Sequence, residues 1–176
     1  MTYNIAISPA KASRLYWLGR YSERVCTVLH MLHKDYDEVL DNESTNVHKS
    51  FCTRLGIPCE EENARQFLKD FLYNREKEYS VINMLERVKD NAILLREELK
   101  SESLAYVEMA INYMKKAQED ESRLYDLQPV TDYLFAFFGA IEERVYNMEV
   151  LNLILIGKYV EKSDLYIRFD YTRNRV

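Results

Sequence analysis

Apolar residues recur at alternating spacings of three and four along the first part of the chain. This spacing places them on one face of an α-helix, which completes a turn in about 3.6 residues. Ser8 is a suitable cap before this stripe, and Pro9 is tolerated at the first helical position. The pattern therefore predicts a long helix from Pro9 to the polar break at 41–42. The stripe consists of Leu15, Leu18, Ser22, Val25, Leu29, Leu32, Tyr36 and Val39.

The rest of the chain contains further helical patterns separated by polar or charged stretches. We expect helices at 47–55, 60–73, 80–99, 101 or 103 to 117, and 147–172, with an apolar segment at 133–138 that Pro129 opens and that ends or bends at Gly139. The core face of segment 80–99 is expected to contain Ile82, Leu85, Val88, Ala92 and Leu95. Few strand signals remain. The sequence therefore predicts an all-α protein, a single domain over 1–176 that forms a bundle of about five to seven helices with long N- and C-terminal helices.

Composition limits the classes of function and the cellular compartment that we expect. The net charge of -5 provides no basic excess to neutralise phosphates, so we expect no nucleic-acid partner. The three cysteines form no CxxC pair and fit free thiols in a reducing cytoplasm. The N-terminus lacks a signal-peptide pattern, and the most apolar stretch, 150–156, is far shorter than the ~20 residues that span a bilayer. We therefore expect a cytoplasmic protein without a membrane segment.

A ten-residue motif occurs twice, near the two ends of the chain. Residues 15–24 read LYWLGRYSER and residues 153–162 read LILIGKYVEK, so each position recurs 138 positions later (19 and 157, 23 and 161). A glycine inside a helix is unfavourable unless its missing side chain is needed for close approach. The repetition predicts two matched helices that meet each other. The positions of interest are Gly19, Arg20, Glu23 and Arg24 in the first copy and Gly157, Lys158, Glu161 and Lys162 in the second.

The spacing within the motif gives a definite geometry. Four residues span about one helical turn, so the glutamate stands at the edge of the notch that the glycine leaves, and the basic residues form a neighbouring row. If the helices cross at Gly19 and Gly157, then Glu23 and Glu161 approach the basic residues of the opposite helix. An ion-pair cluster that sets helix register is the favoured interpretation. The alternative is a polar site between the helices for an anionic or zwitterionic ligand.

These residues closely resemble the Alpha-E family of bacterial helical proteins. The first motif matches the family pattern Leu-Tyr-Trp-Leu-Gly-Arg-Tyr-x-Glu-Arg, and the second resembles its later Gly-Arg-x-x-Glu-Arg, with lysine where arginine is usual. A lysine cannot reproduce the bidentate geometry of arginine. Family members are generally longer, so we expect a short form or a chain that ends after the second motif. A middle block is matched by Asn91, Ala92, Arg96, Leu99, Ser101 and Glu102.

The resemblance also implies a context for the function. Alpha-E genes tend to lie beside genes for ATP-grasp-type ligases and transglutaminase-like proteases. This implies a non-catalytic partner or accessory protein of an ATP-grasp-type ligase in peptide or amide synthesis or modification. One alternative is an enzyme with Glu23 and Glu161 as acid/base groups and Arg20, Arg24 and Lys158 holding an anionic substrate. Another is a structural module that associates with itself.

Other chemistry has little support in the sequence. His30 and His33 have a chelating spacing but lack the Glu-x-x-His pairs of di-iron bundles, so we expect no metal. The scattered glycines form no phosphate-binding loop, and we expect no cofactor. Arg96 and Glu102 are candidates to join the central polar cluster. Fourteen tyrosines, several in or near the repeats, fit either helix-packing edges or a partner surface.

Overall fold

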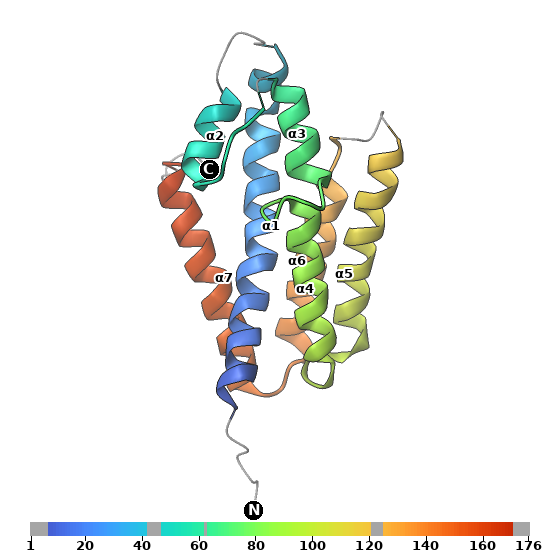
Figure 1. Cartoon of the computed structure of the whole chain (residues 1–176). Helices are drawn as coiled ribbons and strands as arrows, with labels where there is room; N and C mark the ends of the chain where they lie inside the picture. The colour runs from blue at the N-terminus through green and yellow to red at the C-terminus, as the bar shows by residue number, and fades with distance from the viewer. Residues whose placement is uncertain (1–6, 42–46, 62, 121–124, 171–176) are drawn as a thin grey trace, which may run out of the picture.

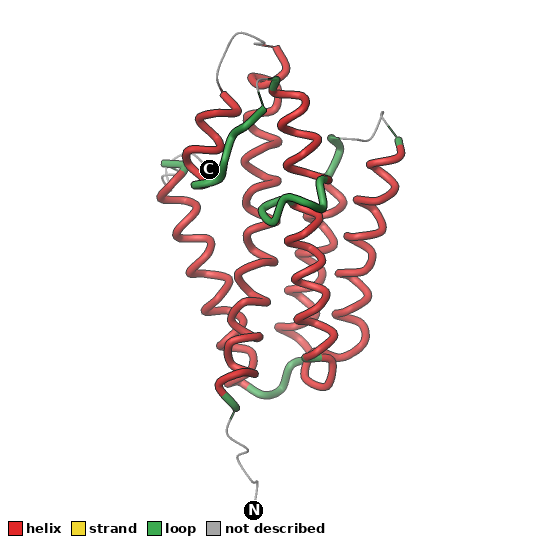
Figure 2. Tube along the Cα trace, in the orientation of Figure 1, coloured by secondary structure: helices red, strands yellow, loops and turns green. Residues whose placement is uncertain are grey.

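The protein folds as a bundle of long α-helices (Figure 1). The computed structural model describes residues 7–41, 47–61, 63–120 and 125–170. For residues 34–41 it describes the backbone only. These residues contain no strand (Figure 2) and confirm the predicted all-α class. The helices are α1 (Pro9–Asp41), α2 (Val47–Leu55), α3 (Ala64–Tyr73), α4 (Val81–Leu94), α5 (Arg96–Glu119), α6 (Gln128–Arg144) and α7 (Met148–Arg168).

Helix starts follow the local chemistry of the sequence. The side chain of Asn63 accepts backbone N–H bonds at the start of α3, Ser80 does so for α4, and Asn147 does so for α7. Such caps satisfy amide groups that have no partner within the helix. Pro9 opens α1 and Pro129 lies in the first turn of α6, where a missing N–H is harmless. The predicted bounds of α1 and α2 are confirmed.

Helix α1 occupies the centre of the bundle and supplies much of its core. It packs against α7 on one side and against α4 and α6 on others, while α5 packs against α4 and α6. Helices α1 and α7 run in the same direction, both starting at the lower end in Figure 1. The described part of the predicted stripe, from Leu15 to Leu32, is buried, and so is the predicted core face of α4. Tyr36 and Val39 lie outside the described side chains.

Three expected helix bounds differ from the structure. Helix α7 ends at Arg168 rather than at residue 172, and the other two differences are the start of α3 and an end at Gly139. Helix α3 begins at Ala64 rather than at residue 60, because Asn63 caps it, while Glu60 and Glu61 lie outside and pair with Lys77. Helix α6 runs through Gly139 to Arg144 without ending there. Gly139 is exposed, and an added Cβ would meet nothing within 4 Å, so no packing constraint interrupts the helix at this position.

The segment expected as one helix over 80–99 divides into two. Helix α4 ends at Leu94, and the backbone N–H of Leu95 closes its last turn. A short helical stretch follows until Lys100, whose positive φ of 64° interrupts α5. The principal part of α5 therefore restarts at Ser101, one of the two predicted restart positions. The break that the sequence did not predict is the end of α4 at Leu94, where no glycine or proline stands nearby and Leu95 provides no side-chain cap.

Two further expectations concern cysteines and membranes. Cys26, Cys52 and Cys59 are all free, as predicted. Among the described residues, no helix combines the length and the apolar character needed to cross a bilayer.

Candidate functional site

Helices α1 and α7 approach each other closely at the two motif glycines. A Cβ on Gly19 would collide with the carbonyl oxygen of Ile154 and lie 2.8 Å from the amide nitrogen of Lys158. A Cβ on Gly157 would collide with the carbonyl oxygen of Tyr16 and lie 3.2 Å from the amide nitrogen of Arg20. Each glycine thus lets the opposite backbone approach to a distance that any side chain would prevent.

These contacts relate the two motif copies by an approximate two-fold symmetry. Gly19 faces positions 154 and 158, while Gly157 faces positions 16 and 20, and each of these pairs differs by the same 138 positions as the repeat. The two parallel helices therefore present equivalent surfaces to each other at the crossing. The symmetry predicts matching surroundings for Glu23 and Glu161, but the side chains depart from it.

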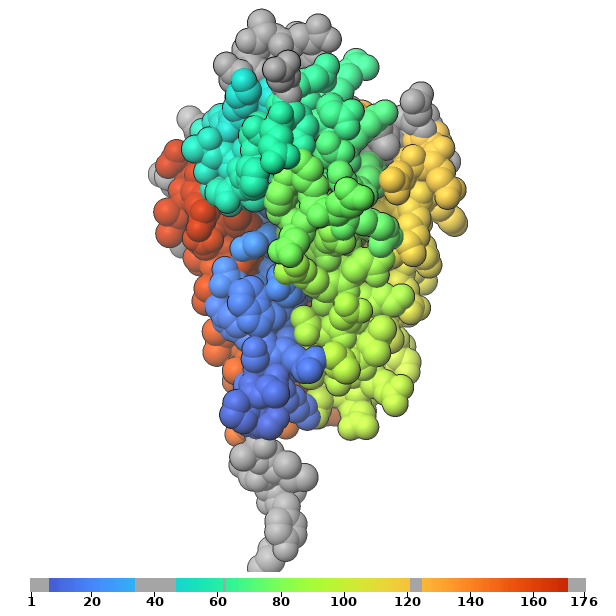
Figure 3. Space-filling view, in the orientation of Figure 1, coloured from blue at the N-terminus to red at the C-terminus, as the bar shows by residue number. Residues whose placement is uncertain are grey.

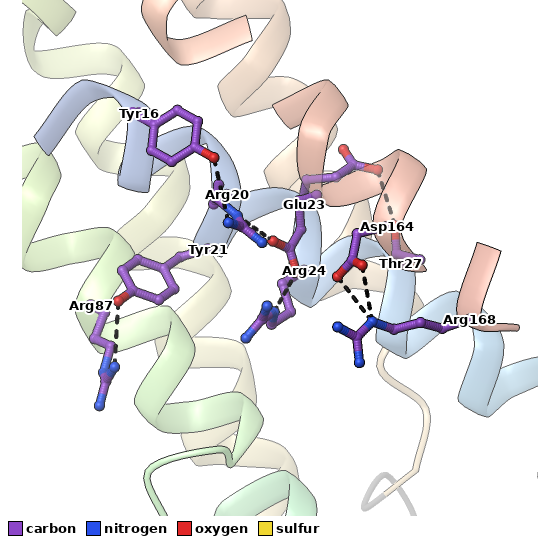
Figure 4. Close-up of polar contacts among 10 residues, drawn as sticks. Tyr16, Arg20, Tyr21, Glu23, Arg24, Thr27, Arg87, Asp164 and Arg168 are labelled. Carbon is purple, nitrogen blue, oxygen red and sulfur yellow. Dashed lines mark hydrogen bonds and ion pairs between the residues drawn. The ribbon is translucent and has the colours of Figure 1, made fainter. Parts of the chain in front are cut away.

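Glu161 lies at the centre of an ion-pair cluster with the first helix. Its side chain is 0% exposed, and Arg20 Nε donates to its Oε2 at 2.6 Å. Arg24 Nε donates to the other oxygen, Oε1. Figure 4 shows the two arginines side by side on one side of α1. Each carboxylate oxygen thus receives a charge-assisted hydrogen bond, the strong kind that fixes one geometry.

Aromatic side chains surround the outer part of this cluster. The guanidinium carbon of Arg20 lies 5.2 Å from the ring centroid of Trp17 and 5.8 Å from that of Tyr16, both within cation–π range. Arg20 also donates to the Tyr16 hydroxyl at 3.4 Å, and Tyr21 stacks on Trp17. The arginine is therefore held by aromatic faces as well as by Glu161, which limits its freedom to move toward a substrate.

Glu23 is also buried, at 4% exposure, but its surroundings provide weaker compensation. Its Oε1 accepts a hydrogen bond from Thr27 Oγ1 at 3.0 Å and lies 3.9 Å from Lys162 Nζ. In Figure 4 the Glu23 carboxylate points away from the two arginines and toward Thr27. Burial raises the pKa of this carboxyl group, and the attraction of Lys162 with the Thr27 hydrogen bond offsets that effect only in part.

Lys158 explains much of the asymmetry between the two glutamates. It is the counterpart of Arg20, but its Nζ lies 3.7 Å from Glu142 and 3.9 Å from the ring centroid of Phe138, both on α6. Its charge still attracts Glu23 from that position. Because α6 packs against α1 on this side, Lys158 has an alternative partner that Arg20 lacks, and Glu23 keeps no close charge-assisted hydrogen bond with it.

A cavity of about 230 Å³ adjoins Glu23 and Lys162. It lies between α1, α3, α6 and α7, and both His30 and His33 line it. Sequence reasoning did not find this cavity, because its walls come from helices distant in the chain. Thr27 was also missed, although its position four residues after Glu23 is a local signal for contact.

The structure separates the remaining candidate residues from the crossing. Arg96 is exposed at the start of α5, and Glu102 pairs with Arg144 at 3.0 Å on the surface. Neither is among the contacts of Glu23 or Glu161 described above. The middle block instead contributes Ala92 and Leu99 to the core. Within the described ranges, no group of three or more His, Cys, Asp or Glu side chains is placed to hold a metal ion.

The geometry of this site can be compared with known proteins. Searches of curated proteins and of solved structures each find no match. A family model matches residues 9–173, and its description is "a predicted alpha-helical domain with a conserved ER motif". Glu23-Arg24, at the α1–α7 crossing, is a Glu-Arg pair of this kind. The match covers almost all of the helical bundle, and the chain belongs to the Alpha-E family.

Proposed function

We propose that this protein is a non-catalytic helical partner of an ATP-grasp-type ligase that makes or modifies a peptide or amide-linked product. The class of partner rests on the gene neighbourhood typical of the Alpha-E family. The binding role rests on one observation of the structure, an apolar face on α7 that the other described helices leave exposed. Stable interfaces commonly use such faces, with aromatic and aliphatic side chains near their centre.

The outer face of α7 carries apolar side chains along the whole helix. α7 packs chiefly against α1, and its buried residues are Val150, Leu151, Ile154, Gly157, Glu161 and Leu165. On the opposite side, Ile156 is 52% exposed, Tyr159 56% and Ile167 77%. An amphipathic surface helix would place polar residues there. The apolar members of this face, which we call the α7 outer face, are Met148, Ile156, Tyr159, Val160 and Ile167.

The polar residues on the α7 outer face are few. Asn152 and Ser163 are exposed between the apolar positions and carry no charge, and Glu149 stands at the start of the helix. Figure 3 shows α7 at the outer edge of the molecule, beside α2 and α1. Single exposed apolar residues are ordinary, whereas a continuous apolar stripe is typical of an interaction site. A partner with an apolar groove that accepts one helix face fits this surface.

The surroundings of the motif favour a non-catalytic role. Glu161 is fully buried and paired with Arg20 and Arg24, so it is not available to exchange protons with a substrate. An enzyme that uses both glutamates as an acid/base pair has less support for that reason. The ion-pair cluster instead fixes the position of α7, and thereby the orientation of its outer face.

The test is binding of an ATP-grasp-type ligase from the same genome, chosen by gene neighbourhood. Isothermal titration with the purified ligase would compare the wild-type protein with a Tyr159→Asp, Ile167→Asp double variant. We expect the double variant to bind at least tenfold more weakly. Leu94→Asp is the matched control, because Leu94 is 61% exposed at the end of α4 and should leave binding unchanged.

Two results would contradict this proposal. A wild-type protein that neither binds the ligase nor changes its rate would exclude the partnership. A wild-type dimer in solution, shown by light scattering and abolished by the double variant, would assign the α7 outer face to self-association instead.

A further inference from the structure

A cavity adjoins Glu23, at the edge of the repeated motif. Its volume of about 230 Å³ exceeds the roughly 150 Å³ of an apolar protein cavity that holds benzene. Both polar and apolar side chains line it. It therefore has the size and the mixed lining of a site for a small amphipathic molecule.

The polar part of the cavity contains one group of each charge. The Glu23 carboxylate is nearly fully buried, and Lys162 Nζ is 3.9 Å from its Oε1. That separation is longer than a direct hydrogen bond of about 2.7–3.2 Å. Both described contacts of Glu23, with Thr27 and Lys162, use Oε1, so Oε2 is the atom that an incoming ammonium group would approach.

The apolar part of the cavity contains leucines from two helices, together with the rings of Tyr125, Phe135 and Tyr166. Leu29 and Leu32 come from α1, and Leu68 and Leu72 come from α3. All four are buried, with exposures between 1% and 7%. A branched aliphatic group inserted among them would be removed from water and would contact side chains of its own kind.

The remaining groups favour binding over covalent chemistry. Cys26 lines the cavity, but burial and the nearby Glu23 charge raise the pKa of its thiol, which therefore stays protonated. Thr131 adds a neutral hydroxyl group on α6. The cavity thus offers the Glu23 carboxylate, the Lys162 ammonium group, the imidazoles of His30 and His33 and an apolar wall rich in leucine, without an activated nucleophile at Cys26.

We propose that this cavity binds a free α-amino acid with an aliphatic side chain. The ligand ammonium group pairs with Glu23, the ligand carboxylate pairs with Lys162, and the side chain packs against the four leucines. An α-amino acid carries its two charges on neighbouring groups, which matches a carboxylate and an ammonium of the protein that lie close to each other without a short hydrogen bond. This site is separate from the α7 outer face and does not depend on the proposed ligase.

The experiment uses L-leucine as the probe, with isothermal titration of the wild-type protein. N-acetyl-L-leucine lacks the ammonium group and L-leucinamide lacks the carboxylate, so each should bind at least tenfold more weakly than L-leucine. Glu23→Gln and Lys162→Met should each weaken L-leucine binding at least tenfold. Glu86→Gln is the matched control, because Glu86 pairs with Arg75 away from the cavity, and it should bind L-leucine as the wild type does.

The possible results separate the ligand classes. Absence of L-leucine binding at millimolar concentration, or unchanged binding in both variants, would overturn the proposal. Equal binding of isoamylamine and L-leucine would make the ligand a simple amine and reject the zwitterion. If circular dichroism shows that Glu23→Gln does not fold, Lys162→Met and the leucine derivatives decide the question, since the side chain of Lys162 is 40% exposed and its loss should not prevent folding.

Discussion

The two glutamates of the repeated motif hold equivalent positions on α7 and α1 and yet have different surroundings. Glu161 accepts one arginine on each carboxylate oxygen and is completely buried. Glu23 has a hydroxyl group and a more distant lysine, and it adjoins a cavity. The same local motif therefore forms a closed structural cluster on one side of the crossing and an accessible polar site on the other. The difference comes from the neighbouring helices and from lysine in place of arginine.

The largest effect should come from the crossing that both glutamates share. Gly157→Ala places a Cβ against the backbone of Tyr16 and forces the helices apart, and we expect it to lower the free energy of unfolding by about 3 kcal/mol. Gly19→Ala should act similarly through Ile154. Urea denaturation followed by circular dichroism measures the change.

Gly139→Ala is the matched control for the crossing glycines. Gly139 lies in a helix with open space around it, so alanine should raise the free energy of unfolding by about 0.5–1 kcal/mol. A similarly mild result for Gly157→Ala would contradict a backbone contact at the crossing.

The next prediction compares the two glutamates directly. Glu161→Gln removes a charge that two arginines share, and we expect a loss of about 2 kcal/mol in the free energy of unfolding at pH 7. Glu23→Gln should change it by less than about 1 kcal/mol, because the carboxylate it replaces is poorly compensated. Chemical denaturation of both variants tests the contrast. Equal losses would show that the two sites are energetically alike.

Most helices of this fold follow from signals that are local in the sequence. The Ser8-Pro9 start, the apolar stripe of α1 and the Asn147 start of α7 each depend on residues within a few turns. The restart of α5 after Lys100 was also expected, from the serines at 101 and 103, but the end of α4 at Leu94 was not, because no glycine, proline or side-chain cap marks it. Gly139 shows the converse, since a glycine in an exposed helix face does not interrupt the helix.

The candidate site likewise has some features that local sequence predicts and others that it does not. The spacing of Gly19 and Glu23 predicted a notch with a carboxylate one turn away, and the structure has that arrangement in both copies. The asymmetry depends on α6, which attracts Lys158 through Glu142, and on α3, which closes one wall of the cavity. These contacts join segments far apart in the chain, and single-sequence periodicity carries no information about them.

A smaller effect should come from exchanging the basic residues between the copies. Arg20→Lys removes the Nε donor to Glu161 and reduces contact with Trp17, and we expect a loss of about 1 kcal/mol in the free energy of unfolding. The counterpart change Lys158→Arg should have an effect within about 0.5 kcal/mol, because Lys158 faces a partly exposed Glu142. Thermal and chemical denaturation measure both. A larger loss of stability for Lys158→Arg than for Arg20→Lys would contradict the proposed asymmetry between the two motif copies.

The smallest effect concerns the pH dependence of stability at Glu23. Its pKa in the folded protein is raised above the ordinary value of a glutamate carboxyl group, about 4.5, because burial outweighs the attraction of Lys162 and the Thr27 hydrogen bond. As pH rises above 4.5, the unfolded chain therefore releases this proton before the folded protein does, and the wild type loses stability through the folded pKa. Glu23→Gln lacks this loss, so its stability relative to the wild type should increase between pH 4 and pH 7.

Denaturation curves of the two proteins across this pH range provide the measurement. The charged groups that face Glu23 are Lys162, Lys158 and Glu161, and His30 and His33 line the same cavity. All of them are present in both proteins, so to a first approximation their titration cancels in the difference between wild type and variant. A relative stability that falls as pH rises would mean that the folded protein stabilises the Glu23 carboxylate, and it would contradict the weaker compensation inferred for this side of the crossing.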